Sequence, residues 1–232
     1  QQRNQKDFSA EIRLLGELDR LKWQFGTYYL HINREVCLNL GLDTGAGVVP
    51  ECYTTDASNP TEALAHDRFK TNVYAIFGSA DYKLAEKLNL GVALRYDVEK
   101  RDVNNLVPTT ARSRWVGNVL TGHPNGTAST SADYYLNPGL DPAYNASGVI
   151  AARQQTFKQL QPKISLSYEP SNYTTLYANW GVGFKSGGFT GRISNAADGS
   201  RPFNPEKVDT YEIGLKGKAA DNRLTYAASA FY

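Results

Sequence analysis

The chain has 232 residues, enough for one large domain, and its formal charge of +2 provides no bulk attraction to nucleic acid. Its mean hydropathy is -0.47, and no run approaches the roughly 20 apolar residues of a spanning helix, so a helical membrane protein is excluded. A membrane β-barrel is not excluded, because its strands alternate apolar and polar residues and keep the average hydropathy low.

The two ends of the chain suggest that it is part of a longer protein. It contains no methionine, and its opening residues, QQRNQKDFSAEIRL, lack the basic and apolar regions of a signal peptide. It ends inside a strand-like pattern, RLTYAASAFY. We therefore expect a mature or excised fragment.

Apolar residues recur with a period of two from the first segment to the last. The pattern is clearest in LNLGVALRYDVE (88–99), where six apolar residues alternate with six small, polar or charged ones. This period excludes a helical stripe and predicts antiparallel strands. We expect eight strands and no helix, with cores at residues 8–14, 21–28, 68–82, 88–100, 162–169, 173–185, 210–217 and 223–232.

The connections between these strands alternate strictly in length. Four are short and polar: GELDR, KLAEK, PSN and KAADN. The other three are long, covering roughly 31–67, 101–156 and 186–206. In an up-and-down sheet this order places every long loop at one end, as in outer-membrane barrels with short periplasmic turns and long external loops.

The two faces of the predicted strands differ in chemistry. One is apolar, with aromatic residues near strand ends at Tyr29, Tyr96, Tyr168 and Trp180, as expected for an interfacial girdle. The other carries many ionisable side chains, which suit a wet lumen better than a sandwich core. We predict that Val92 faces lipid and Ala93 faces the lumen. In the same lumen, we expect Asp97 and Glu99 to be solvated and to pair with Arg95 or a neighbouring strand rather than act in acid–base catalysis.

The glycine-rich segment YANWGVGFKSGGFTGR (177–192) does not match a nucleotide-binding loop. It contains no Gly-Lys-Ser/Thr sequence, and Gly187 follows Gly181 and Gly183 one residue too late for a dinucleotide fingerprint. We interpret Gly181 and Gly183 as inward-facing strand positions that allow close backbone approach or bending.

Two segments resemble the barrel of TonB-dependent outer-membrane receptors. LYANWGVGFKSGGFTGR is similar to a family strand that exits into an external loop, and FNPEKVDTYEIGLKG is similar to the segment that opens the next strand. YAIFGSADYKLAEKLNLGVALRYD also resembles a family hairpin, with Ala93 where glycine is usual. The residues that match the second segment are Pro205, Glu206, Tyr211, Glu212, Gly214 and Lys216.

The resemblance implies that residues 1–232 form part of an all-β, antiparallel, up-and-down transmembrane β-barrel in the outer membrane of a Gram-negative bacterium. It implies no enzyme and no cofactor. The partners it implies are membrane lipid, a small-molecule ligand such as a metal chelate, and the TonB complex, contacted through plug and TonB-box segments that this chain does not show. A ferric siderophore is the expected ligand, with cobalamin, haem or oligosaccharide still open.

Two other hypotheses remain open on the sequence. The first is a complete eight-stranded outer-membrane barrel acting as an adhesin, an enzyme or a structural anchor. The second is a soluble β-sandwich that serves as a binding module. The family-like motifs and the charged face favour the receptor over both.

Candidate functional residues fall in the predicted external loops. In an oxidising compartment we expect Cys37 and Cys52 to form a disulfide, and the spacing of the histidines disfavours a zinc site. His31, His66 and His123 are expected to be solvated loop residues. Aromatic and arginine side chains are candidates for ligand binding, because arginine pairs strongly with anionic groups. These candidates are Tyr134, Tyr135, Phe189, Arg192, Arg201 and Phe203.

Overall fold

A computed structural model describes most of the chain. The described residues are 2–41, 61–107, 115–116, 127–128, 150–189, 202–219 and 221–232. Within them the secondary structure consists of strands, and no helix is long and apolar enough to cross a membrane.

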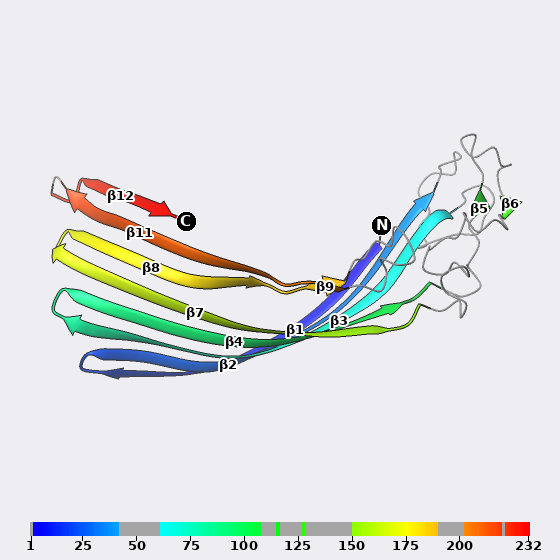
Figure 1. Cartoon of the computed structure of the whole chain (residues 1–232), viewed down its shortest axis with the longest axis horizontal. Helices are drawn as coiled ribbons and strands as arrows, with labels where there is room; N and C mark the ends of the chain where they lie inside the picture. The colour runs from blue at the N-terminus through cyan, green and yellow to red at the C-terminus, as the bar shows by residue number, and fades with distance from the viewer. Residues whose placement is uncertain are drawn as a thin grey trace.

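Eight of these strands form one long, curved antiparallel sheet in which every strand pairs with its neighbour in the chain (Figure 1). The order is β1-β2-β3-β4-β7-β8-β11-β12, so β1 and β12 are the edge strands of the described sheet. The predicted all-β, up-and-down architecture is confirmed. The strands are β1 (Gln2–Leu18), β2 (Leu21–Gly41), β3 (Thr61–Ala85), β4 (Leu88–Asn105), β7 (Arg153–Ser171), β8 (Thr174–Lys185), β11 (Glu206–Ala219) and β12 (Leu224–Phe231).

The four predicted tight turns all lie at one end of this sheet, at the left of Figure 1. The turn between β11 and β12 contains Asp221 and Asn222 with φ of 54° and 68°. Aspartate and asparagine tolerate this left-handed region better than most residues. Because the strands are antiparallel neighbours, the three longer connections start and finish at the opposite end, which we call the loop end.

The predicted boundaries of the long loops are wrong, because the strands extend well into them. β2 continues to Gly41, β3 begins at Thr61, β4 continues to Asn105 and β7 begins at Arg153. His31 and His66, expected in loops, are strand residues of β2 and β3, whereas His123 lies outside the described residues. The outward positions become polar here, whereas inward positions such as Ile32 and Val103 stay apolar, so the alternation changes face while the hydrogen-bonded ladder continues.

Two further ladders involve strands of two residues each. β9 (Gly188–Phe189) pairs with β10 (Pro202–Phe203), within the segment predicted as the 186–206 loop. β5 (Trp115–Val116) pairs with β6 (Thr127–Ala128) in the predicted 101–156 loop.

The register of the sheet collects the apolar positions of all strands on one face. Val92 lies between Ala80 of β3 and Ile164 of β7, and this row continues to Trp180 and Tyr211. We call this the outward face. Ala93 lies between Ser79 and Lys163 on the other, inward face. The predicted sidedness of Val92 and Ala93 is therefore confirmed.

Burial on the two faces is the reverse of that in a water-soluble domain. On the outward face Ile76 and Leu94 are 53% and 49% exposed, whereas Asp97 and Gln159 on the inward face are 7% and 5% exposed. A continuous apolar surface of this extent is not stable in water. The outward face therefore requires an apolar solvent, and lipid provides one.

Candidate functional site

The outward apolar surface stops at a definite level on each strand. Its last members toward the loop end are Tyr29 on β2, Tyr74 on β3, Val98 on β4 and Leu160 on β7, and the next outward positions are polar. We call the outward surface up to this level the apolar belt. Strand residues beyond it lie outside the membrane.

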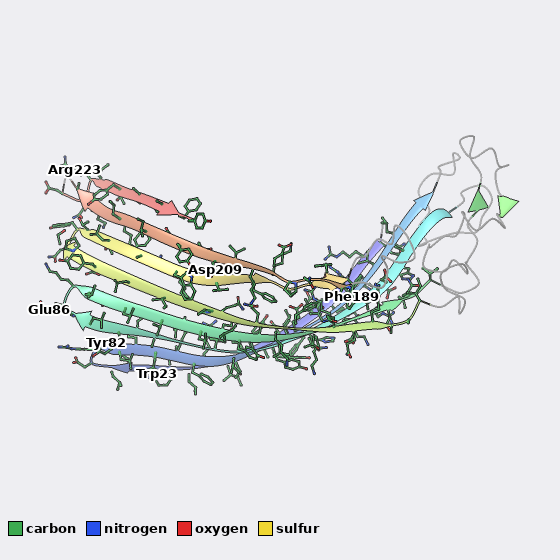
Figure 2. All side chains as sticks on the ribbon, viewed as in Figure 1. Trp23, Tyr82, Glu86, Phe189, Asp209 and Arg223 are labelled. Atoms are coloured by element: carbon green, nitrogen blue, oxygen red, sulfur yellow. The ribbon has the colours of Figure 1, made fainter. Side chains whose placement is uncertain are left out.

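The inward face beyond the belt contains a pocket of about 380 Å³. Side chains of β1 to β4 line it, together with Phe189 of β9, which lies far from the turn end marked by Glu86 and Arg223 (Figure 2). We call it the arginine pocket because of its charged lining. Its charged and aromatic inward-facing residues are Arg3, Arg34, Glu99, Arg101, Phe69 and Phe189.

Arg34 of β2 is a pocket cation with a donor that is unpaired within the described part of the chain. Its guanidinium lies over the Phe69 ring, 4.8 Å from the centroid, and its Nε atom is buried without a hydrogen-bond partner among the described residues. Burial lowers the pKa of Arg34, and the positive charges of Arg3 and Arg101 lower it further. A buried donor without a hydrogen-bond partner raises the free energy of the folded protein. An anion in the pocket would accept this hydrogen bond and remove the penalty.

Arg153 of β7 lies beside the pocket and also has buried nitrogens without hydrogen-bond partners among the described residues. Its guanidinium stands 5.1 Å from the centroid of Phe189, and its Nε and Nη1 atoms are buried without partners in the described part of the chain. Burial lowers the pKa of Arg153, and the nearby Asp67 carboxylate raises it in part. Burial raises the pKa of Asp67, which accepts a hydrogen bond from Asn105 at 3.1 Å.

Arg101 joins the barrel wall to the segment after β8. Its Nε donates to Glu99 at 2.5 Å and its Nη2 donates to the Ser186 hydroxyl at 2.6 Å. The Phe157 ring lies 6.0 Å from its guanidinium. Because Ser186 immediately precedes the buried Gly187 and Gly188, this contact places β9 against the inward face.

The close approach predicted for the glycine-rich segment occurs at different glycines. A Cβ at Gly181 or Gly183 would meet its nearest neighbour at 3.6 or 3.7 Å, an ordinary contact. A Cβ at Gly187 would lie 2.3 Å from the Phe203 carbonyl oxygen and 2.5 Å from the Phe157 ring. Gly187 therefore allows β9 and β10 to pack on the wall, whereas Gly181 and Gly183 are not needed for close packing.

Sequence reasoning located part of this site. Phe189 lines the arginine pocket, and Phe203 pairs with Gly188 in the β9–β10 ladder and is half-exposed. The other predicted ligand residues, Tyr134, Tyr135, Arg192 and Arg201, lie outside the described residues. Arg34, Arg101 and Arg153 were missed because the sequence placed them in or beside loops. Continued alternation of their flanking residues was the available signal.

Asp97 forms the predicted ion pair with Arg95, whereas Glu99 pairs with Arg101 of its own strand and not with Arg95 or a neighbouring strand. Arg95 contacts Asp97 at 2.8 Å, and Gln161 donates to the same carboxylate at 2.6 Å. Glu99 pairs with Arg101, as described above. The inward face thus satisfies its buried carboxylates with neighbouring donors.

Cys37 is buried and disulfide-bonded, whereas its predicted partner Cys52 lies outside the described residues. The Cys37–Cys52 pairing stays a prediction. Peptide mass mapping of the mature protein without reduction should show one linked pair containing both residues. Alkylation of both thiols without prior reduction would contradict the pairing.

An outward cluster beyond the belt predicts a pH response. Glu35 accepts hydrogen bonds from Arg68 at 2.8 Å and contacts His66 Nε2 at 2.9 Å. The Arg68 hydrogen bond, and then that of His66, lowers the pKa of Glu35. An acid with a lowered folded-state pKa stabilises the fold above its unfolded pKa, and this contribution is lost as pH falls through the folded value.

We therefore expect the loop ends of β2 and β3 to lose protection from amide hydrogen exchange as pH falls below about 4. The measurement requires correction for intrinsic exchange rates. Glu35→Gln should show reduced protection already at neutral pH and little further change on acidification. Wild-type protection that persists unchanged to pH 3 would contradict the role of Glu35.

The fold and the inward pocket define a class: this sheet is a wall segment of a transmembrane β-barrel with a polar lumen. The chain belongs to the TonB-dependent receptor β-barrel family, whose description, "TonB dependent receptor-like, beta-barrel", matches residues 1–232. Proteins of this family reside in the Gram-negative outer membrane, which confirms the predicted location and family resemblance.

The chain is similar in sequence to a curated relative and in fold to solved structures. A curated hemoglobin and hemoglobin-haptoglobin-binding protein of Haemophilus ducreyi (strain 35000HP / ATCC 700724) is 25% identical over 120 residues, covering 50% of this chain and 12% of the relative. The ferric yersiniabactin uptake receptor FyuA from Yersinia pestis superposes with a TM-score of 0.65 at 16% identity, over 99% of this chain and 28% of that structure. The siderophore receptor PiuA from Acinetobacter baumannii superposes with a TM-score of 0.60 at 12% identity, over 99% of this chain and 31% of that structure. The chain thus spans under a third of the length of each of these proteins.

Proposed function

We propose that this chain forms part of the ligand-binding wall of a receptor that imports an anionic metal chelate, with a ferric siderophore as the best-fitting class. By analogy with its family, the complete receptor takes its energy from the TonB complex and is not an enzyme. Relatives named for ferric yersiniabactin and siderophore uptake support the ligand class. The sites in the long connections, including Tyr134, Tyr135, Arg192 and Arg201, are part of the same proposal.

The observation that carries the proposal is the unpaired cationic surface of the arginine pocket. Arg34 and Arg153 each present buried guanidinium nitrogens without partners among the described residues, beside the rings of Phe69 and Phe189. Guanidinium donors and aromatic faces together suit a flat, anionic, oxygen-rich ligand. The pocket faces inward and beyond the belt, on the path of a solute entering from outside.

Two further hollows of the described surface do not compete for this role. They measure about 450 and 590 Å³, but most of the residues that line them belong to the outward apolar belt. A soluble chelate would have to leave water and cross lipid to reach them. The arginine pocket is smaller but carries the charges that such a ligand needs.

The proposal is tested with the double variant Arg34→Gln/Arg153→Gln in the full-length receptor. Each charge-assisted hydrogen bond contributes about 1.5–3 kcal/mol, so affinity for an anionic probe, ferric citrate, should fall at least tenfold. Binding of a neutral ferric trihydroxamate should change far less. Titration on purified receptor in detergent measures both.

Arg13→Gln is the matched control, since Arg13 also faces inward but lies below the pocket and pairs with Glu11. It should bind both probes as the wild type does. Unchanged ferric citrate binding in a correctly assembled double variant would remove the arginine pocket from the binding site. An equal loss of both probes would indicate a reshaped pocket and not charge recognition.

A further inference from the structure

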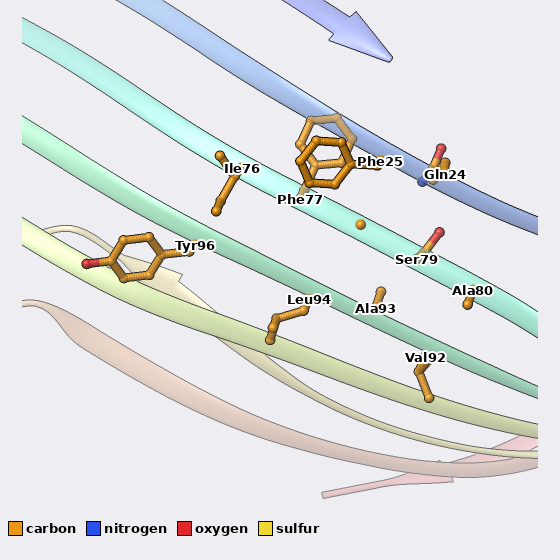
Figure 3. A pocket seen from close by; sticks show the side chains of 11 residues that line it. Gln24, Phe25, Ile76, Phe77, Ser79, Ala80, Val92, Ala93, Leu94 and Tyr96 are labelled. Carbon is orange, nitrogen blue, oxygen red and sulfur yellow. The ribbon is translucent and has the colours of Figure 1, made fainter. Parts of the chain in front are cut away.

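Two apolar grooves adjoin each other on the outward face. The first, of about 450 Å³, surrounds Gly78, where the missing side chain leaves a gap between Phe25 and Leu94 (Figure 3). The second, of about 590 Å³, surrounds Thr27. Ile76 and Tyr96 line both, so the two grooves form one apolar track toward the loop end.

The track ends at a sharp change from apolar to polar side chains. Tyr29, Tyr74 and Val98 line the far end of the second groove. One outward position further along, Tyr29 hydroxyl donates to Asn72 Oδ1 at 3.1 Å, and His31 Nδ1 contacts the same oxygen at 2.8 Å. This is the depth at which hydrocarbon gives way to lipid headgroups.

Three exposed lysines extend across adjacent strands at this level. Lys100 lies opposite Asn72, Lys158 lies opposite Val98, and Lys70 lies opposite Asp102. Lys70 and Lys158 are thus each a diagonal neighbour of Lys100, about 7–8 Å from it, on the strands either side of β4. We call Lys70, Lys100 and Lys158 the lysine row.

The lysine row is not neutralised by the described part of the chain. None of its members forms an ion pair there, and Asp102 instead accepts a hydrogen bond from Gln154 at 2.7 Å. Charges at the turn end are mixed, with Glu17 paired to Lys22 and Asp19 to Arg20. Net positive charge on this wall therefore coincides with the end of the apolar track.

We propose that the track and the lysine row together form a binding site for a phosphorylated membrane lipid. The acyl chains lie in the grooves around Gly78 and Thr27, and the headgroup phosphates lie against Lys70, Lys100 and Lys158. Only a phosphorylated lipid contacts both parts of this site. A soluble anion would pair with the lysines but leave the grooves unfilled, and an uncharged lipid would fill the grooves but leave the lysines unpaired. The site lies on the opposite face from the arginine pocket and is independent of the imported ligand.

The test compares binding of diphosphoryl lipid A with that of the same lipid lacking both phosphates, using native mass spectrometry of the delipidated full-length receptor. Each lysine near a charged headgroup contributes about fivefold in affinity. Lys70→Gln/Lys100→Gln/Lys158→Gln should therefore lower affinity for the diphosphoryl lipid on the order of a hundredfold. The dephosphorylated lipid should bind the wild type weakly and show little response to the substitutions.

A matched control removes the same charge from the inward face through Lys163→Gln/Lys216→Gln/Lys218→Gln, and it should bind the diphosphoryl lipid as the wild type does. Gly78→Leu fills the first groove without touching a lysine and should also weaken binding. Its Cβ would lie 3.3 Å from the Gln24 carbonyl oxygen, a tight contact that requires a small backbone shift, so assembly of this variant is measured alongside binding. Wild-type affinity in the lysine-row variant or in Gly78→Leu would overturn the proposal, as would an equal loss in the inward control.

Discussion

Val92→Arg is expected to destabilise the assembled barrel by about 2–4 kcal/mol, the cost of an arginine on the lipid face near the bilayer midplane. Val92 lies on the outward face between Ala80 and Ile164 and is 43% exposed. It stands near the middle of the outward series of β4, which runs from Leu88 to Val98. Denaturant unfolding in lipid vesicles gives the free energy by linear extrapolation.

Ser79→Arg is the control at matched depth. Ser79 neighbours Val92 diagonally but faces inward, opposite Gln24 and Ala93, with no charged residue directly across from it. Ala93→Arg is a poorer control, because Ala93 lies directly opposite Lys163. The free energy of unfolding of the Ser79 variant should fall by less than about 1 kcal/mol, since the lumen is polar. Equal losses at Val92 and Ser79 would refute the assignment of the two faces.

Gly187→Val is expected to detach β9 and β10 from the barrel wall. The added side chain would begin 2.3 Å from the Phe203 carbonyl oxygen, a backbone atom that moves only with β10, and 2.5 Å from the Phe157 ring. Overpacking of this kind costs about 1–3 kcal/mol, more than a two-residue ladder can offset. Amide hydrogen exchange at Phe189 and Phe203 should rise, and binding in the arginine pocket should weaken.

Gly183→Ala provides the comparison for this change. Gly183 lies in the same glycine-rich segment, but a Cβ there would have its nearest neighbour, the Val208 carbonyl oxygen, at 3.7 Å. Exchange at β9 and β10 should stay at the wild-type level. Normal exchange in Gly187→Val would mean that β9 does not depend on this close approach.

The part of the fold that is immersed in lipid could be predicted from the sequence because its two faces meet different solvents. Residues 88–99 alternate without exception for this reason, and Val92 and Ala93 were assigned correctly. Beyond the belt the outward positions become polar, whereas Leu30, Ile32 and Val36 on the inward face are apolar. The alternation in β2 therefore continues with its faces exchanged, and the predicted loop boundary at residue 31 marks this exchange and not the end of the strand.

The arginine pocket was hidden for a related reason. Arg34, Arg101 and Arg153 are far apart in the chain, and strand pairing alone brings β2, β4 and β7 into one wall. The four glycines between 181 and 188 are likewise equivalent in sequence. Only the position of Phe203 and Phe157 shows that Gly187 is the one under the tightest contact among them.

The contact between Arg101 and Ser186 has a mechanical consequence. Arg101 belongs to β4 and Ser186 follows β8, with β7 between them in the sheet. The hydrogen bond therefore connects two parts of the curved wall across an intervening strand. Backbone ladders hold neighbouring strands at a fixed spacing but allow the sheet to flex about each strand. A tie that passes over a strand resists flattening, so the curvature of the wall at the pocket is held by a side chain as well as by the ladder.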